Sequence, residues 1–223
     1  MQVRVVLFDL YGTLAYVKNA VSDEEASEFL FSRGYEVSPQ QFKAAWAFVA
    51  FIDYPKYGYA SWRSYLKRVL WRLKVKVDEK TLKELLKLFR RNAYKLYPEA
   101  IEAVVKIKNY GLRTAVVTTI ARFKFEKTIK PIKQYFDFIC TGYEARCDKS
   151  NPKMYRKILE TLNVKPEEAV VIGDDLQLDV LLPKKLGIRT VFLDREMKNL
   201  SNSTPDAVVK DLKEAVQIVE KFL

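Results

Sequence analysis

The sequence contains no histidine, and this absence removes several catalytic designs at once. Without an imidazole there can be no Ser-His-Asp or Cys-His nucleophile and no histidine-ligated metal. The only two cysteines, Cys140 and Cys147, are too few for a disulfide framework or a four-ligand zinc site. We expect free thiols, with a local bridge between them as the alternative. Acid, base and metal-binding chemistry must therefore come from carboxylates, Lys or Tyr.

The chain also lacks long apolar stretches and has little glycine or proline. Its longest run without a charged residue, Ala44 to Ile52, is far shorter than the roughly 20 residues that a membrane span needs. Asp9 interrupts the N-terminal apolar run, so no secretory signal is recognised and we expect a cytoplasmic protein. With 49% hydrophobic residues among 223, the sequence predicts one large domain, or a core domain that carries an inserted one.

Positive charge is concentrated in one part of the chain. The net charge is +11, and residues 56–95 hold 13 basic side chains against three acidic ones. Such a segment can be the solvated face of amphipathic helices, which we favour, or can attract an anionic substrate or nucleic acid. No stacking motif or arginine-rich tail supports nucleic acid. A non-catalytic basic binding protein therefore stays as the weakest alternative.

Hydrophobic periodicity divides the chain into two kinds of structure. The apolar run Val3 to Phe8 is typical of a strand buried on both faces. Residues 19–92 show helical spacing, with no convincing strand and all three tryptophans, and predict about four helices. From Tyr97 onward, strands alternate with helices, which predicts right-handed crossovers and a parallel sheet. We therefore predict a doubly wound, Rossmann-like α/β core interrupted after the first strand by a helical insert.

The later elements of this core can be placed by residue number. The expected strands are Leu112 to Val117, Phe138 to Thr141, Ala169 to Ile172, Thr190 to Leu193 and Ala207 to Val209. The expected helices lie after Pro98, across Phe125 to Tyr135, after Asn151, near Val180 to Lys185 and from Leu212.

Polar side chains stand where the predicted strands end. Asp9 follows the first strand, Thr118 follows Val117, and Asp174 follows the run Val170 to Gly173. In an open parallel sheet the carboxyl ends of the strands meet at one edge, where ligands bind. Lys149, in the loop after another strand, can reach the same edge. We expect these side chains to form one site.

The segment GDDLQLD, residues 173–179, adds two further carboxylates to this edge. Asp174, Asp175 and Asp179 supply the oxygen ligands that a hard cation such as Mg²⁺ prefers. A lone Asp is more often a helix cap or turn residue, but several at successive strand ends favour a metal site.

Together these residues carry a resemblance. The segments DLYGTL (9–14), Thr118, KSNP (149–152) and GDD with Asp179 resemble the four ordered motifs of the haloacid dehalogenase superfamily. The long gap between the first two motifs matches that superfamily's helical cap. The resemblance implies a core of residues 1–15 and 96–223 and a helical-bundle cap of residues 16–95, with hinges near Tyr16 and Tyr94.

The resemblance also implies a role for each motif residue. Asp9 would be the nucleophile, Thr118 with nearby backbone N–H groups would hold the transferring group, and Lys149 would neutralise negative charge. The cofactor would be Mg²⁺, and the implied metal residues are Asp9, Tyr11 through its backbone carbonyl, Asp174, Asp175 and Asp179. Tyr11 also occupies a catalytic position. The residues implied to contact substrate are Gly12, Thr13 and Thr119.

Two departures from the family pattern point in opposite directions. The superfamily's phosphatases carry a general acid, a second Asp, at the position of Tyr11, whereas Tyr is typical of 2-haloacid dehalogenases, whose halide needs no proton. Those dehalogenases generally lack the acidic metal cluster, which is retained here. They also carry an Arg early in the cap, and no Arg occurs between Gly34 and Trp62.

We give the retained metal carboxylates more weight than Tyr11. The favoured prediction is a Mg²⁺-dependent phosphohydrolase that acts on a small phosphorylated metabolite through an aspartyl-phosphate at Asp9. The main alternative is a 2-haloacid dehalogenase with Asp9 as nucleophile. The expected partner is a small anionic substrate, without a membrane or nucleic acid, and we expect a monomer or homodimer.

Overall fold

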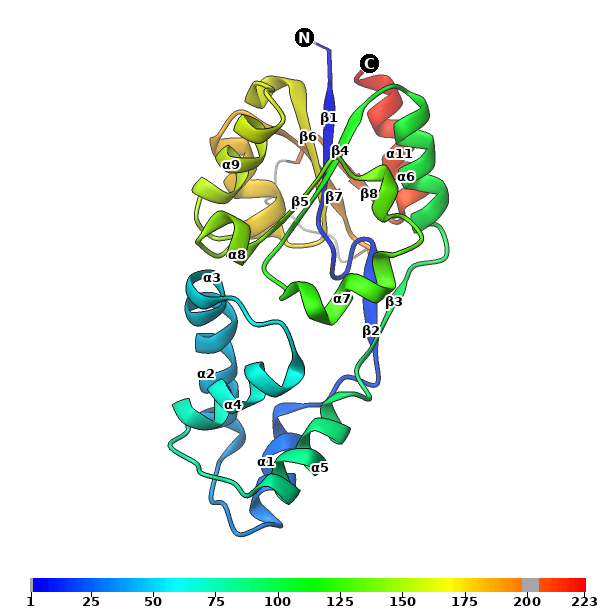
Figure 1. Ribbon diagram of the computed structural model, residues 1–223. Coiled ribbons are helices and arrows are strands. Elements are labelled where there is room, and N and C mark those ends of the chain that lie inside the picture. Colours follow the sequence, from blue (N-terminus) through cyan, green and yellow to red (C-terminus); the bar gives the residue numbers. More distant parts are fainter. Residues whose placement is uncertain (1, 198–204) are drawn as a thin grey trace.

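The computed structural model describes residues 2–197 and 205–223. Figure 1 shows an α/β core and, beneath the carboxyl ends of its strands, a separate helical unit. The core sheet has the order β5-β4-β1-β6-β7-β8, and every neighbouring pair is parallel. Its strands are β1 (Val5–Phe8), β4 (Arg113–Thr118), β5 (Phe138–Thr141), β6 (Ala169–Gly173), β7 (Arg189–Leu193) and β8 (Ala207–Val209).

The first strand shows why this core is buried on both faces. Val6 and Phe8 join the hydrophobic cluster under α6 (Ala100–Asn109), α7 (Arg122–Ile129) and α11 (Leu212–Lys221). The alternate residues, Val5 and Leu7, join a second cluster on the opposite face. The helices that contribute to it are α8 (Gly142–Ala145), α9 (Lys153–Thr161) and α10 (Leu182–Lys185). The predicted doubly wound α/β fold is confirmed.

The helical unit has a hydrophobic core of its own. It contains α1 (Asp23–Phe31), α2 (Pro39–Phe48), α3 (Tyr54–Tyr57), α4 (Trp62–Arg72) and α5 (Glu79–Phe89), and wide π-helical turns at Val49–Asp53 join α2 to α3. Four of these helices start at capping side chains that accept a backbone N–H bond. These caps are Ser22, Ser38, Ser61 and Asp78. The largest buried side chains include Leu30, Phe42, Tyr65, Leu66, Leu85 and Phe89.

An antiparallel pair of short strands, which the sequence did not predict, joins the two parts. In this pair, β2 (Ala15–Lys18) lies against β3 (Ala93–Leu96), with Val17 opposite Tyr94. The backbone N–H of Tyr97 extends the pairing to the carbonyl of Leu14 at 3.0 Å. Both strands lie just outside residues 19–92, so the prediction of a helical block between them holds.

Two predicted helices differ from the observed ones. The helix expected across Phe125 to Tyr135 is α7 followed by a separate 3₁₀ turn at Lys133–Tyr135, because Pro131 interrupts the chain between them. The helix expected near Val180 begins earlier, as a π-helical segment at Leu176–Leu181 that leads into α10. Both cysteines are free, as expected.

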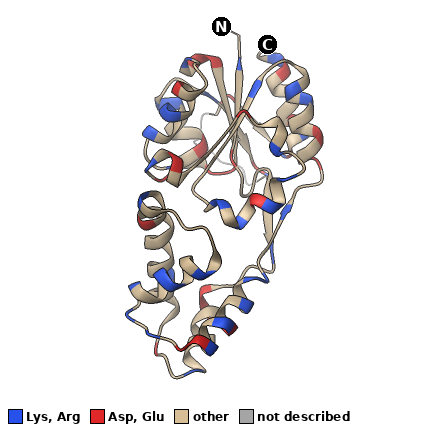
Figure 2. Ribbon diagram, viewed as in Figure 1, with Lys and Arg blue, Asp and Glu red and all other residues tan. Residues whose placement is uncertain are grey.

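Figure 2 shows Lys and Arg along α4 and α5 and the segments around them. Twelve of the 13 basic residues in positions 56–95 are exposed, and Arg68 is partly buried. Several pair with acids of the same unit, such as Arg63 with Glu79 at 2.7 Å. This is the arrangement of solvated helix faces. No helix among the described residues is both long and apolar enough to cross a membrane.

Candidate active site

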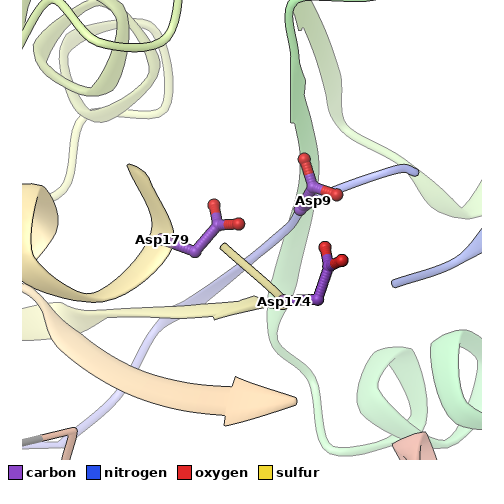
Figure 3. Close-up of side chains that lie close together, drawn as sticks. All are labelled: Asp9, Asp174 and Asp179. Carbon is purple, nitrogen blue, oxygen red and sulfur yellow. The ribbon is translucent and has the colours of Figure 1, made fainter. Parts of the chain in front are cut away.

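The topology brings three of the predicted polar residues to one edge of the sheet. Asp9 follows β1, which lies between β4 and β6, so its neighbours at this edge are Thr118 at the end of β4 and Asp174 after β6. The Asp9 backbone N–H continues the ladder to the carbonyl of Ile172 at 2.9 Å. Figure 3 shows the carboxylates of Asp9, Asp174 and Asp179 gathered at this point.

A buried lysine connects two of these carboxylates. Lys149 Nζ donates to Asp9 Oδ1 and lies 2.6 Å from Asp179 Oδ1. Lys149, Asp9 and Asp179 are 3%, 7% and 0% exposed, so one ammonium group faces two carboxylates away from water. Asp179 also accepts from Tyr155 Oη at 3.1 Å and from the backbone N–H of Asp175 at 3.2 Å. With both of its oxygens engaged, Asp179 chiefly positions Lys149.

The charge balance at Asp9 depends on its neighbours. Burial raises the pKa of Asp9 to about 7, the charge of Lys149 opposes this rise, and the negative charges of Asp179 and Asp174 add to it. Burial alone would lower the pKa of Lys149, but the two carboxylates that it contacts hold that pKa above its usual value. Lys149 therefore stays charged, and positive charge beside Asp9 favours the ionised carboxylate that a nucleophile needs.

The second oxygen of Asp9 lacks a partner. Asp9 Oδ2 is buried and has no hydrogen bond to any of the described residues. Leaving a carboxylate oxygen in this state is costly unless a ligand completes its environment. Ligand oxygens of Asp9, Asp174 and Asp179 all lie within 4.8 Å of one another, and such hard oxygen donors suit Mg²⁺. The orphaned oxygen and the donor chemistry together fit a divalent cation.

Asp175 does not join this cluster. Its Oδ1 accepts from the backbone N–H groups of Gln177 at 2.8 Å and Leu178 at 2.9 Å, so it caps the helical segment that follows. The unpaired N–H groups of a helix start attract such a carboxylate strongly. The structure therefore gives Asp175 a capping contact where the sequence suggested a metal ligand.

Two glycines allow the carboxylates to approach the backbone. Gly12 has φ +88°, and a Cβ there would lie 2.0 Å from Asp174 Oδ2. At Gly173, a Cβ would lie 2.2 Å from Asp179 Cγ. Any larger residue would push these carboxylates out of the site. The structure thus assigns Gly12 a packing requirement beside Asp174.

The other predicted residues occupy different environments at this edge. Thr13 is fully buried and its hydroxyl donates to Asp174 Oδ1 at 3.3 Å, so it positions a carboxylate. Thr118 is 2% exposed, and its hydroxyl accepts from the backbone N–H of Ile120 at 3.2 Å. Thr119 is partly buried, and the side chain of Tyr11 is half exposed to solvent.

Sequence reasoning missed a residue that holds the loop after Asp9. Arg195 Nε donates to the carbonyl of Gly12 at 3.0 Å, and Nη2 donates to that of Thr13 at 2.9 Å. Its third contact is an ion pair with Glu99 at 2.8 Å. Because Arg195 comes two residues after the predicted strand Thr190 to Leu193, the same strand-end rule that found Asp9 could have found it.

Comparison with known proteins shows that this chain is similar to hydrolases. Among curated proteins, a phosphoserine phosphatase from Thermus thermophilus is 32% identical over 56% of this chain, which spans about half (51%) of that protein. The pyrophosphatase PpaX from Bacillus mycoides is 26% identical over 100% of this chain and 99% of its own length.

Solved structures show the same fold. A HAD phosphatase from Thermococcus onnurineus has a TM-score of 0.67 at 24% identity and covers 97% of both chains. A 2-haloacid dehalogenase from Pseudomonas syringae has a TM-score of 0.73 at 18% identity and covers 99% of this chain and 100% of its own. A family model for haloacid dehalogenase-like hydrolases matches residues 3–187, which is most of the chain. The chain therefore belongs to the haloacid dehalogenase-like hydrolase family.

Proposed function

We propose that the protein is a Mg²⁺-dependent phosphohydrolase that acts on a small phosphorylated metabolite through an aspartyl-phosphate at Asp9. One observation carries the proposal: Asp9 is buried with Oδ1 on Lys149 and with Oδ2 unpartnered among the described residues, and a carboxylate oxygen of Asp9 lies within 4.8 Å of oxygens of Asp174 and Asp179. The similarity to a phosphoserine phosphatase and to a pyrophosphatase supports phosphorus as the reacting centre.

The residues of the chain support a two-step displacement. An oxygen of Asp9 would attack phosphorus, and the bond from phosphorus to the leaving oxygen would break with its electron pair going to the leaving group. Water would then attack phosphorus, and phosphate would leave with Asp9 restored as a carboxylate. Lys149 would neutralise charge on Asp9 and on the phosphoryl group, and Thr118 with the backbone N–H groups of the loop would hold phosphoryl oxygens.

The metal would be held at the open side of this site. Asp9 Oδ2, the backbone carbonyl of Tyr11 and Asp174 are the groups we assign to it. Bound Mg²⁺ supplies positive charge to the phosphoryl oxygens. Asp179, already bonded to Lys149 and Tyr155, would keep the lysine in place.

The residue at position 11 limits which esters would react well. A phenol is a weaker proton donor than a carboxylic acid near neutral pH, and general acid catalysis contributes about 10² to 10⁴-fold. Tyr11 is half exposed, so nothing enforces a donor geometry on it. Acyl phosphates, phosphoanhydrides and other good leaving groups therefore suit this site best.

We also propose that residues 16–95, which hold the helical unit and most of β2 and β3, form a cap that closes over the active site. The helical unit lies at the carboxyl edge of the sheet and is joined to the core by β2 and β3 (Figure 1). Paired strands at both crossing points form a compact connection about which two separately packed bodies can turn, because each has its own hydrophobic cluster.

One observation keeps 2-haloacid dehalogenation as the second candidate. Tyr11 stands where a phosphatase would carry its acid, and a halide leaves without a proton. In that reaction Asp9 would attack carbon, and Asp174 would have no metal to bind. The two candidates therefore differ in whether Asp174 is required.

Phosphate release from acetyl phosphate, with and without Mg²⁺, tests the proposal. We expect release that requires Mg²⁺ and disappears in Asp9→Asn and Asp174→Asn, with the neighbouring Asp175→Asn as the matched control that keeps most activity. Halide release from 2-chloropropionate without added metal, retained in Asp174→Asn, would instead establish the dehalogenase. A folded protein with neither activity would contradict both.

A further inference from the structure

A partly buried lysine of the core lies among aromatic rings of the helical unit. Lys124 lies on α7, and its Nζ is 3.8 Å from the ring centroid of Tyr65, 4.3 Å from that of Trp46 and 5.0 Å from that of Trp62. These rings come from α2 and α4, so elements far apart in the sequence build one cage around a single ammonium group. Aromatic faces attract cations through their negative π surfaces.

The cage leaves the hydrogen-bonding capacity of this ammonium unused. An ammonium has three N–H donors, yet Lys124 Nζ forms no hydrogen bond or ion pair with any residue that the structure describes. Burial lowers the pKa of Lys124 to about 7, and no neighbouring carboxylate opposes the shift. Lys124 is partly buried. Lys149, in contrast, is fully buried and has two carboxylate partners. Cations withdrawn from water are ordinarily paired.

A second donor beside it also lacks an acceptor. Tyr65 is 1% exposed, and its hydroxyl has no hydrogen-bond partner in the described part of the chain. Buried polar side-chain atoms in folded proteins nearly always have a partner. Lys124 Nζ of the core and Tyr65 Oη of the helical unit are therefore neighbouring donors that both lack a hydrogen-bond acceptor. A negatively charged or electron-rich group would supply one.

The helix that carries Lys124, α7, lies at the edge of the sheet that holds the proposed active site (Figure 1). This helix starts three residues after Thr119, and the Arg122 backbone N–H donates to Tyr54 Oη of the helical unit at 3.1 Å. Further along, Thr128 donates to the carbonyl of Tyr94 in β3 at 2.9 Å. Figure 1 shows α7 at the carboxyl ends of the strands, facing the helical unit.

We infer that Lys124 and Tyr65 bind a second anionic group of the substrate, a carboxylate or a second phosphate, while the group to be transferred lies at Asp9. The inference rests on the proposed phosphohydrolase function and narrows its substrate class to small metabolites with two anionic groups. This anionic group would accept hydrogen bonds from Lys124 Nζ and Tyr65 Oη. The rings of Trp46 and Trp62 would exclude water from the contact. Hydrogen bonds that involve a charged donor or acceptor are stronger than those between neutral groups.

Binding of two unreactive phosphonates tests the site without turnover. Phosphonoacetate carries a carboxylate where ethylphosphonate carries a methyl group, and both offer the same phosphonate to the Asp9 site. We expect the wild-type protein with Mg²⁺ to bind phosphonoacetate about tenfold more tightly, because one charge-assisted bond is worth about that factor. Tryptophan fluorescence can follow the titration, since Trp46 and Trp62 lie against Lys124.

Four variants show which side chains cause the preference for phosphonoacetate. Lys124→Met should reduce it to about twofold or less, Lys124→Arg should retain most of it, and Tyr65→Phe should lower it about threefold. Lys127→Met is the matched control, because it removes the same charge from an exposed position on the same helix and should keep the preference. Melting temperature and circular dichroism of each variant show that it is folded.

The outcomes separate this inference from the proposed function. Equal binding of the two phosphonates by the wild-type protein, or an unchanged preference in Lys124→Met, would overturn the inference. Equal weakening of both ligands in Lys124→Met would also overturn it and leave Lys124 as a contact that holds the helical unit on the core. A Lys124-dependent preference without phosphate release from any substrate would instead refute the hydrolysis and leave the anion site standing.

Discussion

Lys149 and Lys124 are held in opposite ways. In the core, Lys149 lies between the carboxylates of Asp9 and Asp179, and its charge is fully compensated. At the boundary with the helical unit, Lys124 lies among Tyr65, Trp46 and Trp62, and none of the described carboxylates pairs with it. The comparison teaches that the core site has more negative than positive charge and suits a cation, whereas the boundary site has an unpaired ammonium and suits an anion.

The largest effect is expected at the nucleophile. Asp9→Asn removes the attacking carboxylate but keeps the shape of the side chain, so phosphate release should fall about 10³-fold or more. A colorimetric phosphate assay measures it, and circular dichroism controls for folding. Retention of more than about a tenth of the activity would show that the core site does not work as described.

Substitution of each lysine by methionine tests the comparison through the free energy of unfolding. Lys149→Met leaves two buried carboxylates without a cation, and we expect a loss of about 3 to 5 kcal/mol in the free energy of unfolding. Lys124→Met removes a desolvated charge that has no ion-pair partner, so its cost should be below about 1 kcal/mol. Urea unfolding at neutral pH measures both changes. Equal losses would mean that the two lysines are not held differently.

A smaller effect is expected where the core meets the connection to the helical unit. Arg195 holds the carbonyls of Gly12 and Thr13 and also pairs with Glu99, which follows β3. Arg195→Ala should lower kcat/KM about 10- to 100-fold through misplacement of the loop, mainly in kcat, and Arg195→Lys should restore part of it. Steady-state kinetics test this, and unchanged kcat in Arg195→Ala would refute the positioning role.

The smallest effect separates two neighbouring carboxylates of the core. Asp175→Ala removes a helix cap and should cost about 1 kcal/mol in stability. Its affinity for Mg²⁺, measured by calorimetry, should change far less than that of Asp174→Ala. Equal loss of Mg²⁺ affinity in the two variants would show that Asp175 also contributes to metal binding.

The sequence predicts the core better than the boundary, for physical reasons. Buried parallel strands require continuous apolar runs such as Val3 to Phe8, and the carboxyl ends of these strands meet at one edge of the sheet. The proximity of Asp9, Thr118 and Asp174 could therefore be predicted from the sequence. The same rule cannot distinguish a metal ligand from a cap at Asp175, because both functions use a carboxylate directly after a strand.

The features that sequence reasoning missed depend on contacts between distant segments. The strands β2 and β3 are four residues each and pair across the whole helical unit, so neither gives a local signal. The cage around Lys124 draws rings from α2 and α4, whose relative placement follows from the packing of the helical unit. No spacing along the chain relates Trp46, Trp62 and Tyr65 to Lys124.

The central claim is that Asp9 carries the phosphoryl group during turnover. Rapid acid quenching of the protein with acetyl phosphate and Mg²⁺, followed by peptide mass spectrometry, tests it directly. We expect the mass of one phosphoryl group on the peptide that contains Asp9, and no such adduct in Asp9→Asn. Phosphate release that persists in Asp9→Asn, or an adduct on any other residue, would contradict the account.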